Sequence, residues 1–318
     1  MEQREVSNPL PHEWICGVFM ISLWLRLVWS GSLFSRDALL LLLLIVSNVG
    51  LLIFASLRKS NLTWRLRLVF YPVAMNLVYF LLATAVPSVH PEPEDRLLQS
   101  IDLWIFGSHP AIWLEPYVQP VATEFLSICY LWYLFYLFSS QIEYLVGDID
   151  TSKLHYAGLF SIYGIGYACY SLVPAVGPYI AIADQFTVSL EGGWFTHLTS
   201  ETVLAASNRV DVFPSLHVAI TIYLLMFDRR HKRWRFLLYL FPCIGLIIAT
   251  IYLRYHYATD VICGAGLSML ALWIARDQST KVRSMPVEDM ANGNQAETCA
   301  HHGSVERYRA GTGETLCT

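Results

Sequence analysis

Long apolar stretches recur along the chain and are separated by shorter polar segments. A helix that crosses a bilayer needs about 20 mainly apolar residues. Eight stretches approach or reach that length, and they cover residues 13–34, 37–57, 68–87, 119–141, 154–175, 213–228, 236–254 and 257–275. This pattern predicts an all-α, polytopic bundle of eight membrane helices. The first contains Arg26, and the sixth is short because Pro214 fixes its start.

The composition supports a membrane protein and argues against a soluble domain. Of the 318 residues, 55% are hydrophobic and only 14% are charged, and the mean hydropathy is +0.45. The seven cysteines are scattered and show no metal-ligand or disulfide spacing. We therefore expect no cofactor, no metal and no nucleic-acid partner.

Basic residues are distributed unevenly between the polar loops. They crowd the loop after the second apolar stretch (Arg58, Lys59, Arg65, Arg67) and the loop after the sixth (Arg229, Arg230, Lys232, Arg233, Arg235). Loops rich in Lys and Arg stay in the cytoplasm. Eight alternating spans place both loops there, together with the N- and C-termini.

Two long loops fall on the opposite, non-cytoplasmic side. Residues 88–118 are rich in Pro and Trp, and residues 176–212 contain paired glycines. Long loops in compact domains are commonly functional. The polar segment from residue 277 onward is predicted to be a disordered cytoplasmic tail.

Two histidines border apolar stretches on this non-cytoplasmic side. His217 opens the sixth stretch in Phe-Pro-Ser-Leu-His, and His256 opens the eighth in Arg-Tyr-His-Tyr-Ala-Thr-Asp. Both stretches run inward from the same face, so the two side chains are predicted to lie at one depth. Pro214 suits the first turn of a helix, and Ser215 would add a hydroxyl to the free N–H groups there, which bind anions.

An aspartate accompanies the second histidine. His256 and Asp260 are spaced i, i+4, which places them on one face of a helix. A carboxylate that accepts one ring N–H fixes the tautomer and leaves the other nitrogen as a nucleophile. The two segments together predict a site for phosphoryl-transfer chemistry at a membrane surface.

These residues resemble the type 2 phosphatidic acid phosphatase superfamily, and most of all its inositol phosphorylceramide synthase-like branch. The motif Pro-Ser-x-His matches Pro214, Ser215 and His217, and His-x-x-x-Asp matches His256 and Asp260. Further similarity to that branch lies in residues 102–107, 174–178 and 252–257.

The resemblance implies a metal-independent transfer through a phosphohistidine on His256, oriented by Asp260. His217 would protonate the departing alcohol and then activate the incoming water or alcohol. Ser215 would help to hold the phosphoryl oxygens. The resemblance also implies a catalytic core over residues 67–276, preceded by accessory helices in 1–66 and followed by the tail, 277–318.

Three cations familiar from the superfamily are missing from their expected positions. The first motif, Lys-x6-Arg-Pro, has no match, Tyr179 replaces the arginine of Gly-Pro-Arg, and Ala249-Thr250 replaces a Ser-Arg pair. Arg254 is the first candidate to replace them as a phosphate ligand, followed by Arg209 and Tyr179. Arg254 qualifies only if the turn before the last span breaks the helix, because a regular helix would point it away from His256.

Several alternatives remain open at this stage. Hydrolysis and head-group transfer, for example of an inositol-type group to a lipid alcohol, use the same histidines. A non-catalytic lipid-phosphate-binding or transport protein could retain the same bundle. Asp102, Glu115 and Glu124 either hold a polyol head group or serve as helix caps and interface polarity. The substrate lipid, the organelle and the oligomeric state are not determined by the sequence.

Overall fold

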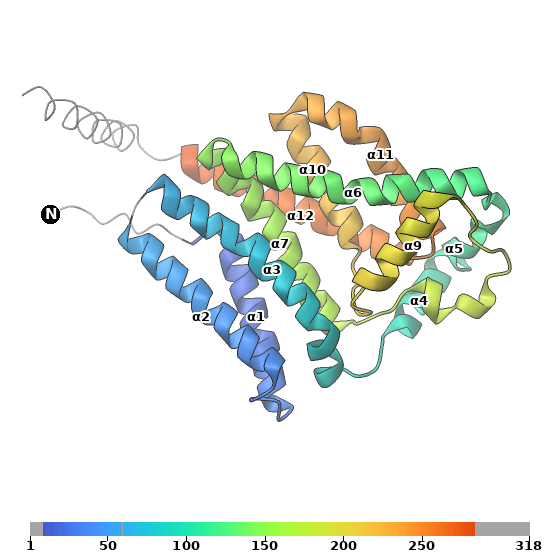
Figure 1. The fold of residues 1–318 in the computed structure, drawn as a ribbon, viewed down its shortest axis with the longest axis horizontal. Helices are drawn as coiled ribbons and strands as arrows, with labels where there is room; N and C mark the ends of the chain where they lie inside the picture. Colours follow the sequence, from blue (N-terminus) through green and yellow to red (C-terminus); the bar gives the residue numbers. More distant parts are fainter. Residues whose placement is uncertain (1–8, 59, 284–318) are drawn as a thin grey trace, which may run out of the picture. The chain divides into compact units, whose positions relative to one another are not determined.

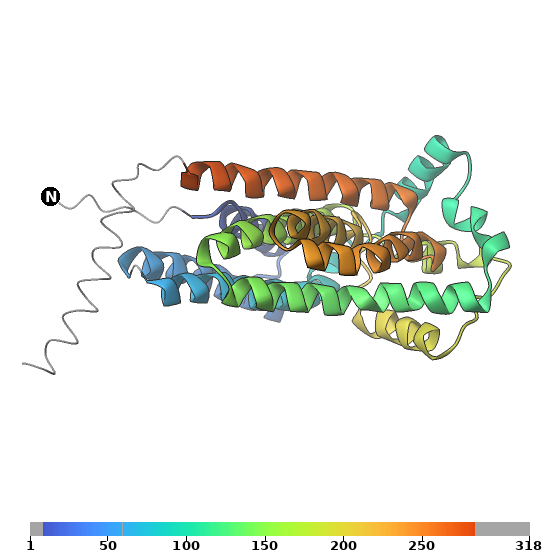
Figure 2. The ribbon, with the colours of Figure 1, turned by 90° about the horizontal axis from the view of Figure 1, so that it is seen from above.

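The computed structural model describes residues 9–58 and 60–283, with side chains described as far as Asp277. Within these residues the chain is helical and contains no strand (Figures 1 and 2). All eight predicted stretches coincide with long helices: α1 (Pro11–Trp29), α2 (Arg36–Leu57), α3 (Asn61–Val89), α6 (Pro120–Val146), α7 (Ile149–Leu172), α10 (Leu216–His231), α11 (Arg233–Tyr252) and α12 (Ala258–Arg283). The predicted all-α bundle is confirmed.

Five of these helices are long and apolar enough to cross a membrane, namely α2, α3, α6, α11 and α12. Helix α10 has only 16 residues and ends in Asp228 and two arginines. Helix α1 includes His12, Glu13 and Arg26, which lower its hydropathy. Helix α7 is rich in Gly, Ser and Tyr. The membrane-spanning role of α1, α7 and α10 therefore stays a prediction.

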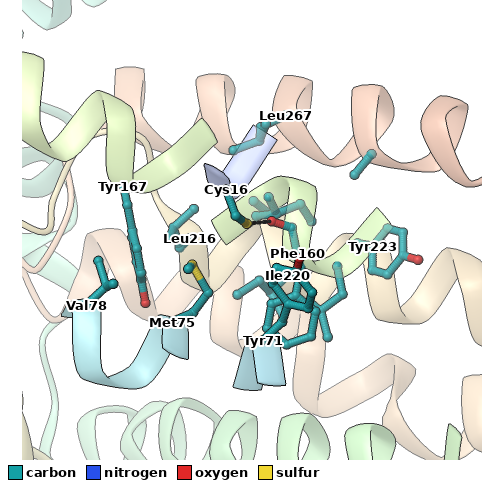
Figure 3. Packing of buried hydrophobic residues seen from close by; sticks show 14 of the residues in the cluster. Cys16, Tyr71, Met75, Val78, Phe160, Tyr167, Leu216, Ile220, Tyr223 and Leu267 are labelled. Carbon is teal, nitrogen blue, oxygen red and sulfur yellow. Dashed lines mark hydrogen bonds between the residues drawn. The ribbon is translucent and has the colours of Figure 1, made fainter. Parts of the chain in front are cut away.

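The core is built where α7 meets α1, α3 and α10, while α6 and α10 both pack on α11. Figure 3 shows part of this core, with Cys16, Tyr71, Phe160 and Tyr223 in close packing. Gly166 of α7 lets Leu216 approach, since a Cβ there would lie 2.4 Å from the leucine side chain. This close approach fixes the first turn of α10, which carries His217.

Both long loops fold into short helices. The first holds α4 (Asp95–Phe106), α5 (Pro110–Trp113) and η1 (Glu115–Tyr117), and the second holds α8 (Pro178–Ala181), η2 (Ala183–Gln185) and α9 (Trp194–Ala206). Helices α4, α5 and α9 gather at one end of the bundle (Figure 1). The two loops are therefore well placed to build a site together.

Two glutamates fasten the second loop to the first half of the chain. Glu115 accepts the backbone N–H groups of Thr187 and Val188 at 2.8 and 3.0 Å. Glu124 accepts three N–H groups at the start of α9, from Gly193, Phe195 and Thr196. Glu124 therefore caps α9, and Glu115 supplies an acceptor to N–H groups of the loop before it.

The predicted division of the chain into accessory helices, core and tail stays a prediction. Residues up to Arg276 form one compact unit, within which α1 and α2 pack on α7 and α3. Helix α12 continues to Arg283, beyond the predicted start of the disordered tail at 277. Residues 284–318 of that tail lie outside the described residues.

Candidate active site

Helix α10 begins at Leu216, two residues after the Pro214 position that the sequence suggested. Pro214 follows a cis peptide bond after Phe213 and lies before the helix, so the expectation that it occupies the first turn is wrong. Ser215 is the N-cap instead, and its hydroxyl accepts the N–H of Val218 at 3.4 Å. Ser215 is fully buried, so the observed role of its hydroxyl is to start the helix that carries His217.

The start of α10 is fastened to the start of α12. The N–H of Ser215 donates to the carbonyl oxygen of Asp260 at 3.1 Å. The carbonyl oxygen of Ser215 lies so close to α12 that a Cβ on Gly264 would approach it to 2.4 Å. Because real Cβ atoms do not approach an oxygen so closely, glycine is required at this crossing. The backbone around Ser215 is therefore placed by α12 as well as by its own helix.

His256 lies in the turn between α11 and α12, which corrects the expectation of one continuous helix face with Asp260. The turn closes when the N–H groups of Tyr255 and His256 both donate to the carbonyl oxygen of Thr250. Helix α12 starts only at Ala258, and Asp260 caps this start by accepting the N–H of Tyr257 at 2.8 Å.

A backbone carbonyl is the nearer partner of the His256 ring. Its Nδ1 lies 3.1 Å from the carbonyl oxygen of Val212 and 3.6 Å from Asp260 Oδ2. A carbonyl oxygen only accepts, so in the neutral ring Nδ1 carries the proton and Nε2 carries the lone pair. The expected orientation by Asp260 is thus shared, with Val212 in the closer position, and Asp260 Oδ1 is buried without a hydrogen-bond partner among the described residues.

The two histidines face each other across the junction of α10 and α12. Their ring centroids are 5.8 Å apart and the rings are inclined by 61°. His217 Nε2 also lies 3.3 Å from the hydroxyl of Tyr130 on α6, and the rings of Tyr130 and Tyr133 pack on it at 4.9 Å. The structure thus brings together His217, His256 and Asp260, as expected.

Two aspartates of α4 hold the His256 turn from outside. Asp102 accepts the N–H groups of Ala258 and Thr259 at 3.0 and 2.9 Å, and so caps α12 rather than the helix after itself. Asp95 accepts the N–H groups of residues 176 and 177 and the hydroxyl of Tyr257. Sequence reasoning missed Asp95, because its partners lie more than 80 residues away along the chain.

Gly177 joins the same assembly. It has φ of +90°, and a Cβ there would lie 2.7 Å from the carbonyl oxygen of Tyr255. The next short helix is tied in by the N–H of Tyr179, which donates to the carbonyl oxygen of Arg254 at 2.9 Å. The loop before α8 therefore braces the turn that carries His256.

Arg254 contacts protein partners rather than an open site. Its guanidinium lies 3.3 Å from Glu115 Oε1, donates to the carbonyl oxygen of Val188 at 2.5 Å, and lies 4.0 Å from the ring centroid of Phe186. Partial burial lowers the pKa of Arg254, while the charge of Glu115 opposes that shift. Its predicted role as a phosphate ligand would require release from Glu115, and it stays a prediction.

The Glu115 side of this pair is stabilised in its charged form. Desolvation acts to raise the pKa of Glu115, but hydrogen bonds from the N–H groups of Val188 and Thr187 and the charge of Arg254 outweigh it, so the pKa is lowered. The pair therefore persists through the neutral range and fixes the second loop.

Tyr179 and Arg209 lie near each other at the edge of the site. Burial raises the pKa of Tyr179, and a hydrogen bond with Ser207 and the charge of Arg209 act in the opposite direction. Tyr179 packs edge-on against Tyr255, whose ring packs in turn on Tyr130 beside His217. Arg209 has an exposed side chain and a φ of +60°. Their contacts with phosphate stay a prediction.

Among the described residues, no cluster of three or more His, Cys, Asp or Glu side chains is arranged to hold a metal ion. The arrangement consists instead of two facing imidazoles, one of which has a fixed tautomer and a free Nε2. Such a pair can supply a nucleophile and a proton donor for one reaction centre.

Comparison with known proteins agrees with this arrangement. A family profile described as the PAP2 superfamily matches residues 96–274, from α4 to α12, and includes both histidines and Asp260. This match supports the superfamily and does not support the predicted inositol phosphorylceramide synthase-like branch. No curated protein and no solved structure matched the chain. Since the matched region spans more than half of the chain, the protein belongs to the PAP2 superfamily, which together with its five apolar helices supports an integral-membrane enzyme of the lipid phosphatase type.

Proposed function

We propose that this protein cleaves a lipid-linked phosphate ester through a phosphohistidine intermediate on His256. The observation that carries the proposal is the hydrogen bond between His256 Nδ1 and the carbonyl oxygen of Val212 at 3.1 Å. In the neutral imidazole this bond assigns the lone pair to Nε2, and the His217 ring lies 5.8 Å away, centroid to centroid. A phosphoryl group between the two rings would meet a nucleophile on one side and an acid on the other.

The proposed reaction has two steps, formation and then breakdown of the phosphohistidine. In the first, the lone pair of His256 Nε2 forms a bond to phosphorus while the bond from phosphorus to the alcohol oxygen breaks, and His217 gives its proton to that oxygen. In the second, neutral His217 takes a proton from water or an alcohol, whose oxygen attacks phosphorus and breaks the P–N bond. His256 returns to its starting form, and His217 is protonated again.

The negative charge on the phosphoryl oxygens would be stabilised at the start of α10. The free N–H groups of that first turn and the helix dipole favour an anion. Ser215 caps this turn, and Arg254, Arg209 and Tyr179 are the candidates to add further contacts. For Arg254 this role requires the guanidinium to leave Glu115, from which it lies 3.3 Å away.

Hydrolysis and transfer differ only in the group that reaches the phosphohistidine. We keep head-group transfer of an inositol type to a lipid alcohol, including a sphingolipid, as the finer form of the proposal, together with metal independence. We also place the site at the non-cytoplasmic face and both termini in the cytoplasm. The support for this sidedness is the crowding of Lys and Arg in residues 58–67 and 229–235.

A second candidate function is lipid-phosphate binding or transport without turnover. The ion pair of Arg254 with Glu115 favours it, because it leaves Arg254 engaged with protein and so less able to stabilise the charge of a transition state. A binder would retain phosphate affinity and show no product at any enzyme concentration.

The proposal can be tested on purified protein with a panel of lipid phosphates and candidate alcohols. Mass spectrometry of the products would distinguish free phosphate from a transferred head group. A His256→Asn variant would keep an N–H for the Val212 carbonyl and remove the nucleophile, so turnover should disappear while the fold persists. His197→Asn, at an exposed position on α9, is the matched control and should keep activity.

Unchanged turnover in His256→Asn would rule out the mechanism. Addition of a chelator should leave the rate unchanged, and a requirement for a divalent metal would contradict the phosphohistidine route. Lipid-phosphate binding without turnover in the wild type would favour the second candidate.

A further inference from the structure

A small cavity lies beside His217, and no residue of α12 is among those that line it. It has a volume of about 120 Å³ and is formed by α3, α6, α9 and the segment before α10. Its chemically distinctive wall residues are Tyr79, Tyr130, Tyr133, Asp211 and His217. A cavity of roughly this size admits a group of a few heavy atoms, since about 150 Å³ is enough to hold benzene. It is too small for an acyl chain but large enough for a polar group near the reacting oxygen.

The position of this cavity relates it to one side of the reaction. In phosphoryl transfer the attacking and leaving atoms lie roughly in line with phosphorus. His256 would attack from the α12 side, so the alcohol must lie on the His217 side. The cavity contains His217 in its wall, and His256 is not among its lining residues. It therefore meets the alcohol part of the substrate rather than the phosphoryl group.

Asp211 gives this cavity a negative charge. Its carboxylate accepts the hydroxyl of Tyr79 at 2.5 Å and that of Ser207 at 2.9 Å. No ion pair joins it to a Lys, Arg or His side chain anywhere in the described part of the chain. A carboxylate beside a phosphate site repels the substrate, unless the substrate brings a positive charge of its own.

The tyrosines complete an environment suited to a cation. Tyr130 and Tyr133 are buried, each residue being 8% exposed, and Tyr79 lies beside the carboxylate. Aromatic faces attract ammonium groups, and the attraction strengthens when water is excluded. A carboxylate and several tyrosine rings around a small cavity are the chemistry that recognises an ammonium group.

We propose that this cavity binds an ammonium group carried by the alcohol near its reacting oxygen, so that the enzyme favours amino-alcohol phosphates. This inference rests on the proposed function for the position of the alcohol. The amine can belong to the departing lipid, as in a long-chain amino-alcohol phosphate, or to a small amino alcohol that acts as acceptor. Asp211 supplies the counter-charge, and Tyr79, Tyr130 and Tyr133 supply the aromatic walls.

The test measures binding in His256→Asn protein, which cannot turn its ligand over, reconstituted in nanodiscs. The probes are a long-chain 2-amino-alcohol phosphate and its isosteric 2-hydroxy counterpart, with ethanolamine as a competitor. We expect about tenfold tighter binding of the amine, from aromatic and carboxylate contacts together. Asp211→Asn should remove this preference, and Asp184→Asn, a control at an exposed acid, should retain it.

Each outcome decides the inference. An amine preference that disappears in Asp211→Asn supports the lipid as the source of the ammonium group. Equal binding of the two lipids, with ethanolamine competition that depends on Asp211, supports the acceptor as the source. Equal binding without such competition, or a preference that survives Asp211→Asn, overturns the inference.

A second variant keeps the inference testable if Asp211→Asn does not fold. If Asp211→Asn lowers the melting temperature strongly, Tyr133→Leu tests the aromatic wall instead and should reduce the preference several-fold. Retention of the full preference in Tyr133→Leu would then overturn the inference. These measurements need no turnover, so a negative result would leave the phosphohistidine mechanism standing. Conversely, unchanged turnover in His256→Asn would rule out the mechanism and leave an observed amine preference standing.

Discussion

Helix α10 carries an ionisable group at each end, half-buried His217 in the first turn and Asp228 in the last, and the two groups differ in how they are paired. Asp228 in the last turn is fully buried. Its carboxylate accepts the hydroxyls of Tyr136 and Tyr144 at 2.7 and 2.5 Å and an N–H of Arg235 at 3.1 Å. Arg235 is paired in turn with Glu143, which also binds Lys232. Asp228, Arg235, Glu143 and Lys232 thus form one network of opposite charges.

The first turn of the same helix, about 16 Å away at 1.5 Å per residue, is built differently. His217 has a single hydroxyl partner at 3.3 Å. Near it, His256 keeps a free Nε2 and Asp260 Oδ1 has no hydrogen-bond partner among the described residues. Complete pairing is what structural stability demands, because a buried unpaired group is costly. The end with two facing imidazoles is the one that we propose takes a substrate.

The largest expected effect is on catalysis at the His217 end. His217→Gln keeps an amide that can meet Tyr130 and removes the group that transfers a proton. Turnover should fall by about 10²–10⁴-fold, which is the usual contribution of general acid–base catalysis. The melting temperature should stay close to that of wild type. Steady-state kinetics checks the effect, with His197→Gln as the control, and a rate equal to that of the control would show that His217 is not the acid.

The matching effect at the paired end is on stability. Asp228→Ala leaves Arg235 and two tyrosine hydroxyls without their acceptor, which should cost about 3–5 kcal/mol. Asp150→Ala is the control, since Asp150 forms an exposed pair with Lys153 at 2.9 Å and such pairs contribute about 0–1 kcal/mol. Denaturation in detergent micelles measures both. Equal stability of the two variants would contradict the comparison.

A smaller effect should follow from moving the first turn of α10. Gly264→Ala places a Cβ 2.4 Å from the carbonyl oxygen of Ser215, so the turn before His217 must shift. We expect about 1–3 kcal/mol of destabilisation from overpacking and a turnover rate reduced roughly tenfold or more through misplaced geometry. Gly266→Ala, with no atom within 4 Å of the new Cβ, should be neutral. Equal stability and equal turnover of the two variants would contradict the claim that close packing at Gly264 positions this turn.

The smallest effect concerns the one hydroxyl that meets His217. Tyr130→Phe removes a hydrogen bond of the kind that contributes about 0.5–1.5 kcal/mol, so the rate should fall by roughly 2- to 13-fold. The pH profile of kcat should shift as well, because the hydroxyl interacts differently with neutral and protonated imidazole. Tyr117→Phe, at an exposed position, is the control. An unchanged pH profile would mean that Tyr130 only packs against the ring.

The sequence predicted the features that depend on local pattern. Apolar stretches placed the eight long helices, and two short motifs placed His217, His256 and Asp260 together. Contacts between distant segments were not predictable, because their partners carry no local signal. The carbonyl of Val212 is a backbone atom that any residue would supply. Asp95 and Asp102 look like ordinary polar residues of a loop until the N–H groups of residues 176–177 and 258–259 fold onto them.

Arg254 illustrates the limit of motif reasoning. Arg254 was a candidate phosphate ligand on the condition that the helix breaks before the last span, and a break does occur, with φ of +68° at Arg254 itself. The break turns the guanidinium toward Glu115, 139 residues away in sequence. Only the fold of the intervening loops could show that pairing.

The central claim is that His256 carries the phosphoryl group, and trapping this intermediate tests it most directly. Wild-type protein mixed with a lipid phosphate and quenched under alkaline conditions within milliseconds should be digested and analysed by mass spectrometry. A phosphoryl group on the peptide containing His256, absent from His256→Asn protein, is the predicted result. Product formation at a normal rate with no phosphoryl group on His256, or with the group on another residue, would contradict the account.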